Sequence, residues 1–182
     1  EEAADKVLRI AGNRLRVISP DVGGGFGLKE VPGPESILAL VGARLIDRPV
    51  LWVAERSEAF ASDFHARDNH STATLALDAE GRFLALRVDT IANIGAYISL
   101  NGLNSSTNNL GGLSGVYRTP AIFTRVTGVF TNTQPTAPYR GAGRPEATYA
   151  IERVIDVAAR RLGMDPVELR RKNMIAPSQM PY

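Results

Sequence analysis

The sequence predicts an α+β fold, in which strands and helices alternate along the chain. Residues 83–91 alternate between apolar and polar side chains, a period of two that is typical of a half-buried strand. Residues 147–162 place apolar side chains at the i, i+3 and i+4 spacing of an amphipathic helix. Two glycine-rich turns, at residues 23–27 and 139–144, each precede a helical pattern. A sheet that carries helices accounts for these patterns.

The N-terminal third predicts a strand, a helix and a second strand. Residues 15–18 are a short strand candidate that ends before Pro20, and residues 50–54 have the pattern of a buried strand. Pro34 opens the helix, because proline at the first helical position loses no hydrogen bond, and residues 47–49 end it. Apolar residues cover much of the circumference of this helix, so we expect it to be buried. These residues are Ile37, Leu38, Leu40, Val41 and Leu45.

A β-hairpin is expected next. Residues 72–77 and 83–91 flank the loop 78–82, in which Gly81 stands where a positive φ is needed. The apolar side chains expected to share one face of the second strand are Leu84, Leu86 and Val88.

The C-terminal half predicts a long loop, a strand and two helices. Residues 98–115 are rich in Asn, Ser and Gly and contain no Arg or Lys, which predicts a loop. Residues 122–132 form a strand candidate. A helix begins at Pro145 and ends before Gly163, and Asp165 caps a further helix. The apolar stripe of the longer helix consists of Ala147, Ala150, Ile151, Val154, Ile155, Ala158 and Leu162.

The composition argues against several classes of function. The chain has 182 residues, of which 44% are apolar and 22% charged, as in ordinary globular proteins. A net charge of +2 with dispersed arginines argues against nucleic-acid binding, which needs clustered positive charge. The chain contains no cysteine, so it has no disulfide framework and no thiolate metal site. No apolar run approaches the roughly 20 residues that span a bilayer, and we expect a cytoplasmic protein without a membrane span.

The two glycine-rich turns predict a binding site. Each combines bare backbone with one large side chain, which lets a bulky ligand approach the main chain closely. We expect the turns to form two walls of one cofactor pocket; the alternative is a pair of tight strand-to-helix turns. Neither a dinucleotide fingerprint nor a phosphate-binding Gly-Lys-Ser/Thr loop fits these residues.

Three segments carry a resemblance to a known family. Residues 21–30 resemble the first cofactor-binding segment in the large subunit of molybdenum hydroxylases. This is the family of xanthine dehydrogenase, aldehyde oxidase and the aerobic carbon monoxide dehydrogenases. Residues 138–147 resemble its active-site loop, and residues 162–170 with Asn173 resemble the helix pair that follows. The similarity runs in order over essentially the whole chain.

The resemblance implies a cofactor and the residues that bind it. The cofactor is molybdopterin with molybdenum, in the cytosine dinucleotide form in most bacterial members. Arg140 matches the arginine beside the pterin and the metal; its alternative role is that of a solvated or ion-paired loop arginine. Because the pterin holds the metal, no direct metal ligand from the protein is implied. The residues that match the segment beside the metal's apical oxygen are Gly24, Gly25, Phe26 and Gly27.

The resemblance also narrows the substrate. Glu30, Gly141 and Ala142 match positions of the substrate pocket, although Glu30 can equally be a first-turn residue favoured by the dipole of the following helix. Members that oxidise carbon monoxide carry a cysteine after the loop arginine, so Gly141 disfavours this reaction. Xanthine-type members have an aromatic residue at the position of Ala142 and an arginine within residues 98–117, so a purine is also disfavoured. The loop looks like that of form II relatives, and we expect an aldehyde or an N-heterocycle.

Catalysis and metal binding are expected to depend on residues outside the glycine turns. The resemblance implies oxidative hydroxylation assisted by a glutamate, and nothing in this chain matches that residue, which we expect downstream of Tyr182. His65 and His70 are candidate metal ligands, but without cysteine the two are more typical of loop and hairpin-entry histidines.

We expect residues 1–182 to be a single fragment of a molybdopterin-binding domain, with possible subdivisions near 55–70 and 135–145. Its start at Glu1 rather than at Met suggests a piece of a larger protein. The resemblance implies a two-layer arrangement, with a mixed or antiparallel sheet and helices on one side. It also implies as partners the remainder of the large subunit, an iron–sulfur subunit, a subunit with FAD and a small-molecule substrate. We expect the fragment alone to be inactive and to expose apolar surface.

Two other functions stay open at this stage. One is a catalytically inactive assembly or structural subunit of the same family, and the other is an unrelated module that binds a small ligand.

Overall fold

The computed structural model describes residue 6, residues 8–30 and residues 32–182. The chain divides into two compact units, Glu1–Phe64 and His65–Tyr182. The hydrophobic core of the described residues lies in the second unit. Its fully buried members include Leu86, Leu113, Ile155 and Leu169.

The first unit contains short helical elements. They are the 3-10 helices η1 (Gly12–Arg14) and η2 (Leu28–Glu30) and the α-helices α2 (Pro34–Ile46) and α3 (Arg56–Ser62). The strands predicted at residues 15–18 and 50–54 are wrong, since both segments lack strand structure. A strand needs a neighbour with which to exchange backbone hydrogen bonds, and the described residues of this unit contain no strand. Leu51, at 89% exposed, shows that the apolar run is not buried.

Helix α2 has the predicted ends but not the predicted burial. It begins at Pro34, and Asp47 follows its last residue with a left-handed φ of 50°. No residue of α2 is buried, and Leu45 is 80% exposed. The reason is that the described part of this unit has no sheet for α2 to cover. Its apolar circumference therefore remains on the surface.

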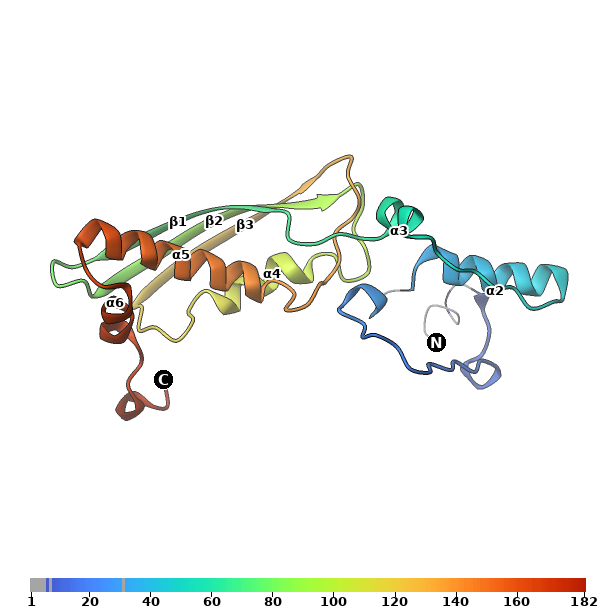
Figure 1. Cartoon of the computed structure of the whole chain (residues 1–182), viewed down its shortest axis with the longest axis horizontal. Helices are drawn as coiled ribbons and strands as arrows, with labels where there is room; N and C mark the ends of the chain where they lie inside the picture. The colour runs from blue at the N-terminus through green and yellow to red at the C-terminus, as the bar shows by residue number, and fades with distance from the viewer. Residues whose placement is uncertain (1–5, 7, 31) are drawn as a thin grey trace. The chain divides into compact units, whose positions relative to one another are not determined.

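The second unit is built on a three-stranded mixed sheet (Figure 1). The strands are β1 (Asn69–Leu77), β2 (Phe83–Gly95) and β3 (Ala121–Phe130), in the order β1-β2-β3. β1 and β2 pair antiparallel, whereas β2 and β3 pair parallel. The prediction of an α+β fold is confirmed.

The predicted hairpin joins β1 and β2. The Oδ1 atom of Asp78 accepts hydrogen bonds from the backbone N–H groups of Glu80 (3.1 Å) and Arg82 (2.7 Å), and these bonds close the loop. The strand register shifts between Ala76 and Leu77, so that Leu77 pairs with Phe83. Phe83 therefore faces the core, and Leu84, which we expected there, is 48% exposed.

Helix α4 (Asn104–Gly112) lies within the stretch predicted as a loop. It is part of the crossover from β2 to β3, which a parallel pair requires. Its buried residues are small and polar: Ser105, Ser106 and Asn109. At Gly112, a Cβ atom would lie 2.8 Å from the Cβ of Ala147. The prediction failed because close packing against another helix outweighs the low helix propensity of Ser, Asn and Gly.

Helices α5 (Arg144–Leu162) and α6 (Pro166–Asn173) complete the unit. Helix α5 runs along the sheet, and the helices of this unit cover one of its faces (Figure 1). Gly143 precedes α5 and Gly163 follows it, both with positive φ. The side chain of Asp165 caps α6, as predicted. The buried residues of α5 are Ala147, Ile151, Ile155, Ala158 and Ala159; Leu162 of the predicted stripe is 42% exposed.

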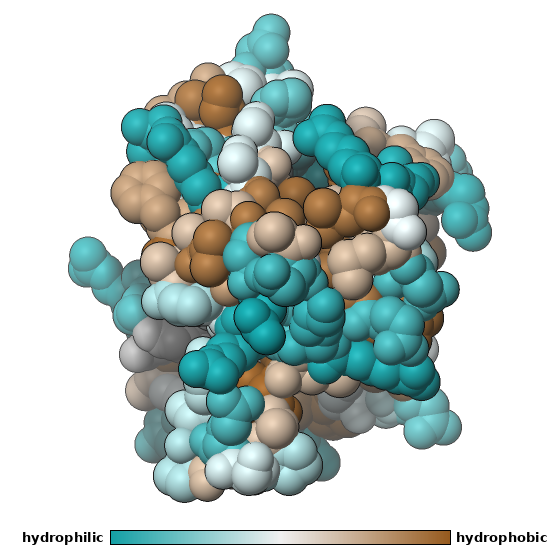
Figure 2. Space-filling view, turned by 90° about the vertical axis from the view of Figure 1, so that its left-hand side faces the viewer, coloured by the Kyte–Doolittle hydropathy of each residue, from teal (hydrophilic) through white to brown (hydrophobic). Residues whose placement is uncertain are grey.

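The opposite face of the sheet is open and carries both charged and apolar side chains, with Ile91 (52%) and Phe123 (53%) exposed. Arg87 Nε and Arg125 Nη2 contact the two carboxylate oxygens of Asp89 at 2.7 and 2.8 Å. The hydrogen bond from Arg87 lowers the pKa of Asp89. The guanidinium of Arg87 also lies 5.4 Å from the ring centroid of Phe123. Seen from the left-hand side of Figure 1, hydrophobic residues elsewhere on the molecule also reach the surface between polar ones (Figure 2).

A polar network joins α5, α6 and the segment before β3. Glu152 on α5 accepts hydrogen bonds from Tyr117 Oη (2.7 Å) and from Arg170 Nε (2.8 Å). Arg170 Nη2 also donates to Asp156 (2.9 Å). Arg170 of α6 thus contacts two carboxylates of α5.

The hydroxyl of Tyr117 is expected to lose its proton only at unusually high pH. Burial, followed by its hydrogen bond to the Glu152 carboxylate, raises the pKa of Tyr117 to about 12, from about 10 in an unfolded chain. The neutral phenol is therefore favoured by folding. Its contribution to stability is complete below pH 10 and is lost as the pH rises towards 12.

The absorbance of tyrosinate, followed during an alkaline titration, measures this effect. Wild-type protein should show a late phase that the Tyr117→Phe variant lacks. If the Tyr117→Phe variant keeps the late phase, this phase belongs to another group.

Candidate functional site

The first glycine turn has a left-handed backbone. Gly24, Phe26 and Gly27 have φ values of 101°, 51° and 93°. A left-handed φ is uncommon for a residue other than glycine and costs about 1–3 kcal/mol. The turn is closed by hydrogen bonds from the N–H of Lys29 to the carbonyl of Gly25 (3.1 Å) and from Glu30 to Gly27 (3.0 Å). Phe26 is thus held in a strained conformation by the turn around it.

The turn presents bare main chain beside an aromatic ring. A Cβ atom on Gly24 would lie 2.7 Å from Cε2 of Phe26, so only glycine lets the ring lie there. At Gly23 and Gly25, no heavy atom lies within 4 Å of the position of a Cβ atom. Phe26 is 48% exposed. The backbone of the turn is therefore open to a ligand that stacks or packs against the ring.

Glu30 lies close to this turn along the chain. It is the last residue of η2 and is exposed. The acidic residue in the first turn of α2 is Glu35, while Glu30 is the first-turn acidic residue of η2. Its place in a substrate pocket stays a prediction.

The second glycine turn also has a left-handed backbone. Gly141, Ala142 and Gly143 have consecutive φ values of 98°, 45° and 97°. The N–H of Ala142 donates to the carbonyl of Tyr139 at 2.8 Å. A Cβ atom on Gly143 would lie 3.0 Å from the carbonyl carbon of Ser105 on α4, so the turn rests directly on that helix. Ala142 is the one residue of the three that has a side chain.

Arg67 joins this turn from the segment before β1. Its Nη2 atom donates a hydrogen bond to the carbonyl oxygen of Arg140, and its guanidinium lies 4.6 Å from the ring centroid of Tyr139. Arg67 Nε also forms an ion pair with Glu146 (3.9 Å). Sequence reasoning missed Arg67, because no local pattern links it to a turn so far along the chain.

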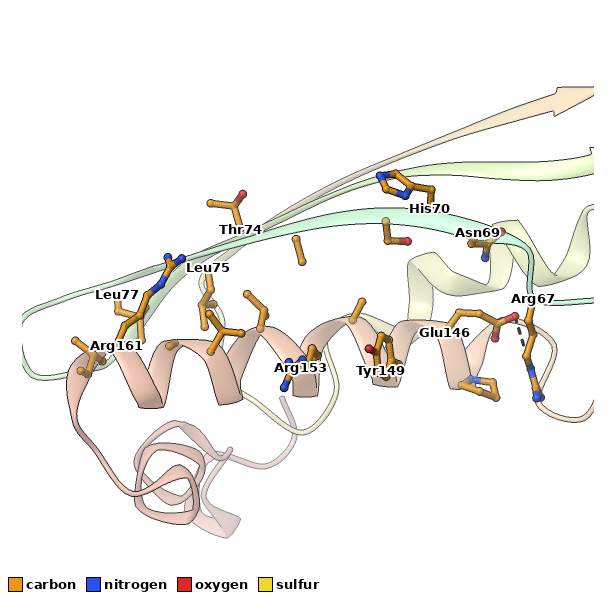
Figure 3. Close-up of a pocket in the computed structure, with 18 residues that line it drawn as sticks. Arg67, Asn69, His70, Thr74, Leu75, Leu77, Glu146, Tyr149, Arg153 and Arg161 are labelled. Atoms are coloured by element: carbon orange, nitrogen blue, oxygen red, sulfur yellow. Dashed lines mark ion pairs between the residues drawn. The ribbon is translucent and has the colours of Figure 1, made fainter.

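A groove of about 1010 Å³ lies between β1 and α5 (Figure 3). Its walls are largely apolar and include Leu75 and Val154, whereas Arg153 and Arg161 also line it. The ion pair between Arg67 and Glu146 is at the end next to the second turn (Figure 3). None of the residues predicted to contact the cofactor or the substrate lines this groove, whereas His70, a candidate metal ligand, does.

Each unit brings its own predicted residues together. The first unit holds residues 24–27 and Glu30 within one short segment, and the second holds residues 140–142 in one turn. The convergence of Phe26 and Arg140 on one cavity stays a prediction.

The two histidines have structural surroundings. His65 Nε2 lies 2.9 Å from the carbonyl oxygen of Gln134, and its backbone forms a bridge with Thr136. His70 is exposed and points away from α5 (Figure 3). The described residues contain no group of three side chains that could hold a metal ion.

The family comparison matches the glycine turns to a known domain. Residues 1–174 match the family of the molybdopterin cofactor-binding domain. The large chain of carbon monoxide dehydrogenase from Hydrogenophaga pseudoflava is 40% identical over 95% of this chain. Subunit gamma of the 6-hydroxypseudooxynicotine dehydrogenase complex from Paenarthrobacter nicotinovorans is 36% identical over 97% of it.

A solved structure has the same fold. The crystal structure of quinoline 2-oxidoreductase from Pseudomonas putida 86 superposes with a TM-score of 0.85 and 40% identity, covering 90% of this chain and 21% of that one. The chain likewise spans 22% of the length of each of the two curated relatives. None of the helices in the described residues is both long and apolar enough to cross a membrane.

Proposed function

Because this chain belongs to the molybdopterin cofactor-binding domain family, we propose that its two glycine turns contact the cofactor of a molybdenum hydroxylase. The observation that carries the proposal is the open backbone at Gly23 and Gly25 beside the exposed ring of Phe26. Main-chain N–H groups in such a turn attract an anionic oxygen, and no side chain blocks its approach.

The residues of both turns fit this role. In the first turn, the backbone of residues 24–27 would receive the metal's oxygen ligand, with the ring of Phe26 packed beside it. In the second, the guanidinium of Arg140 would donate to anionic oxygens of the cofactor, for which its planar shape is suited. When bound, molybdopterin with molybdenum supplies the oxidative hydroxylation of an electron-poor carbon. The chain itself binds and orients the cofactor, and we place the catalytic glutamate in another segment of the protein.

We propose an aldehyde or an N-heterocycle as the substrate, beside Glu30, Gly141 and Ala142. Quinoline 2-oxidoreductase, named for an N-heterocycle, is 40% identical to this chain. A carbon monoxide dehydrogenase is equally similar, but this chain has glycine after Arg140 and no cysteine that could bind copper there. Carbon monoxide is therefore disfavoured as a substrate.

The remaining parts of the proposal concern the whole protein. The name of the Paenarthrobacter relative describes a subunit of a dehydrogenase complex, which supports a multi-subunit assembly. We propose the remainder of a large subunit, an iron–sulfur subunit and a subunit with FAD as partners. The cofactor would be the cytosine dinucleotide form, and the complex would be cytoplasmic.

Gly25→Val in the full-length protein tests the first turn. The site of the added side chain is empty of neighbouring atoms, so the fold should tolerate it while the approach of a ligand is blocked. We expect the molybdenum and pterin content to fall about tenfold or more, the loss that follows when hydrogen bonds to a charged group are removed.

Gly111→Ala is the matched control, because Gly111 also has open space around it but lies on α4. This variant should keep the cofactor. Equal cofactor content in wild type and Gly25→Val would refute the role of the turn. Full-length wild type without cofactor would favour an inactive assembly subunit, and stoichiometric molybdenum in residues 1–182 alone would contradict the expected inactivity of this piece.

A further inference from the structure

We infer that Arg67 is a positioning residue that holds the second glycine turn in the conformation that receives the cofactor. The inference rests on the proposed function, which assigns residues 140–142 to the cofactor and substrate site. It concerns a residue that lies outside both glycine turns.

The side chain of Arg67 makes contacts on both sides of the second glycine turn. The guanidinium of Arg67 donates to the carbonyl of Arg140, lies over the ring of Tyr139 at 4.6 Å, and pairs with Glu146 at 3.9 Å. These partners lie on both sides of the left-handed residues 141–143. Arg67 therefore ties the beginning of the turn to the first turn of α5.

The shape of the guanidinium suits this set of contacts. A guanidinium is planar, so it can stack on an aromatic ring while its N–H groups donate at the edges. A lysine ammonium can pair with Glu146 but cannot combine stacking with directed donation. The contact set is thus specific to arginine.

The backbone of Arg67 has an unusual conformation. Its φ of 65° is left-handed, which costs about 1–3 kcal/mol for a residue other than glycine. Two backbone hydrogen bonds fix His65, two residues earlier in the chain. Its N–H donates to the carbonyl of Pro135 (3.3 Å), and its carbonyl accepts from the N–H of Ala137 (3.0 Å). This segment is anchored beside residues 135–137, which precede the second turn, and the unusual φ belongs to the residue that reaches the turn.

Glu146 lies in a mostly buried position. Its side chain is only 11% exposed, and neither carboxylate oxygen accepts a hydrogen bond from the described residues. A mostly buried carboxylate is costly without a positive partner, and Arg67 is the cation that the structure places beside it. Glu146 thus favours the position of the guanidinium next to Tyr139 and Arg140.

The test uses the full-length protein with Arg67→Ala and Arg67→Lys. Hydrogen exchange at the N–H groups of Ala142 and Arg144, which close the turn, reports the order of the turn directly. We expect exchange to become about tenfold faster or more in Arg67→Ala, since a hydrogen bond from a charged donor is lost. The cofactor content of Arg67→Ala should fall as well. Arg67→Lys should restore little of the protection from exchange and little of the cofactor content.

Rescue and a matched control separate positioning from general stability. Guanidinium ion at a non-denaturing concentration should restore part of the protection in Arg67→Ala, whereas sodium chloride at equal ionic strength should not. Arg153→Ala removes another arginine of the same groove and should behave as wild type. Unchanged exchange in Arg67→Ala, or an equal effect of Arg153→Ala, overturns the inference.

The outcomes also separate this inference from the proposed function. If wild type lacks molybdopterin, the proposed function fails, and the exchange measurement still tests whether Arg67 orders the turn. If wild type holds the cofactor and Arg67→Ala holds it equally well with a protected turn, the inference about Arg67 fails alone.

Discussion

Replacing Asn173 with alanine is expected to lower the free energy of unfolding by about 3–5 kcal/mol. Asn173 is 4% exposed and joins the end of α6 to the β-hairpin. Its Oδ1 accepts the N–H of Phe83 at 2.8 Å, and its Nδ2 donates to the carbonyl of Gly81 at 2.9 Å. Each buried group left without a partner costs about 1–3 kcal/mol, and the deleted side chain adds a cavity. Such a loss is a large part of the stability of an ordinary domain.

Urea denaturation measures this change in the free energy of unfolding, provided that the slope of that free energy against urea concentration is the same in variant and wild type. Asn108→Ala is the control, because Asn108 is an exposed residue of α4 and should change stability by less than about 0.5 kcal/mol. Asn173→Asp keeps the size of the side chain but turns a carboxylate oxygen towards the carbonyls of Gly81 and Leu169. It should be as destabilising as alanine, and a stability like that of wild type would contradict the hydrogen-bond explanation.

Gly143→Ala is expected to cost about 3–4 kcal/mol, the sum of a left-handed φ for alanine and an overpacked contact. The added Cβ would meet the backbone of α4, at 3.0 Å from the carbonyl carbon of Ser105 and 3.1 Å from the nitrogen of Asn109. Backbone cannot rotate away as a side chain can, so α4 or the turn has to move. We therefore also expect the second glycine turn to lose its conformation.

Gly163→Ala separates the two causes. Gly163 has a φ of 65°, but no atom lies within 4 Å of its Cβ position, so the variant should cost only about 1 kcal/mol. The difference between the two variants in denaturation midpoint measures the contact with α4. Equal effects would show that backbone strain alone explains the requirement for glycine at position 143.

The fold of the second unit is largely predictable from sequence. The hairpin follows from period two and from Asp78 and Gly81 in its loop, and α5 follows from its apolar stripe between Pro145 and Gly163. Both signals are local, because one short segment contains the whole pattern. The burial of Phe83 in place of Leu84 could not be predicted from one segment, because it results from the register between β1 and β2.

The prediction of loops and strands failed where neighbours decide the structure. Helix α4 forms in a segment of poor helix formers because Gly112 allows close approach to Ala147 on α5. Residues 15–18 and 50–54 have strand composition, but no strand of the first unit's described residues lies beside them. The composition of a segment indicates that it can form a strand, but a neighbouring strand determines whether it does.

The sequence by itself determined the family of this chain, the α+β class and the two glycine turns, because these depend on residue types in short, ordered segments. Tertiary structure alone decided that Gly143 rests on α4, that Asn173 joins α6 to the hairpin, and that Arg67 reaches the second turn. Each of these contacts joins residues far apart in the chain. Local periodicity and turn chemistry carry no information about such pairs, because the distance between them is set only when the sheet and its helices pack.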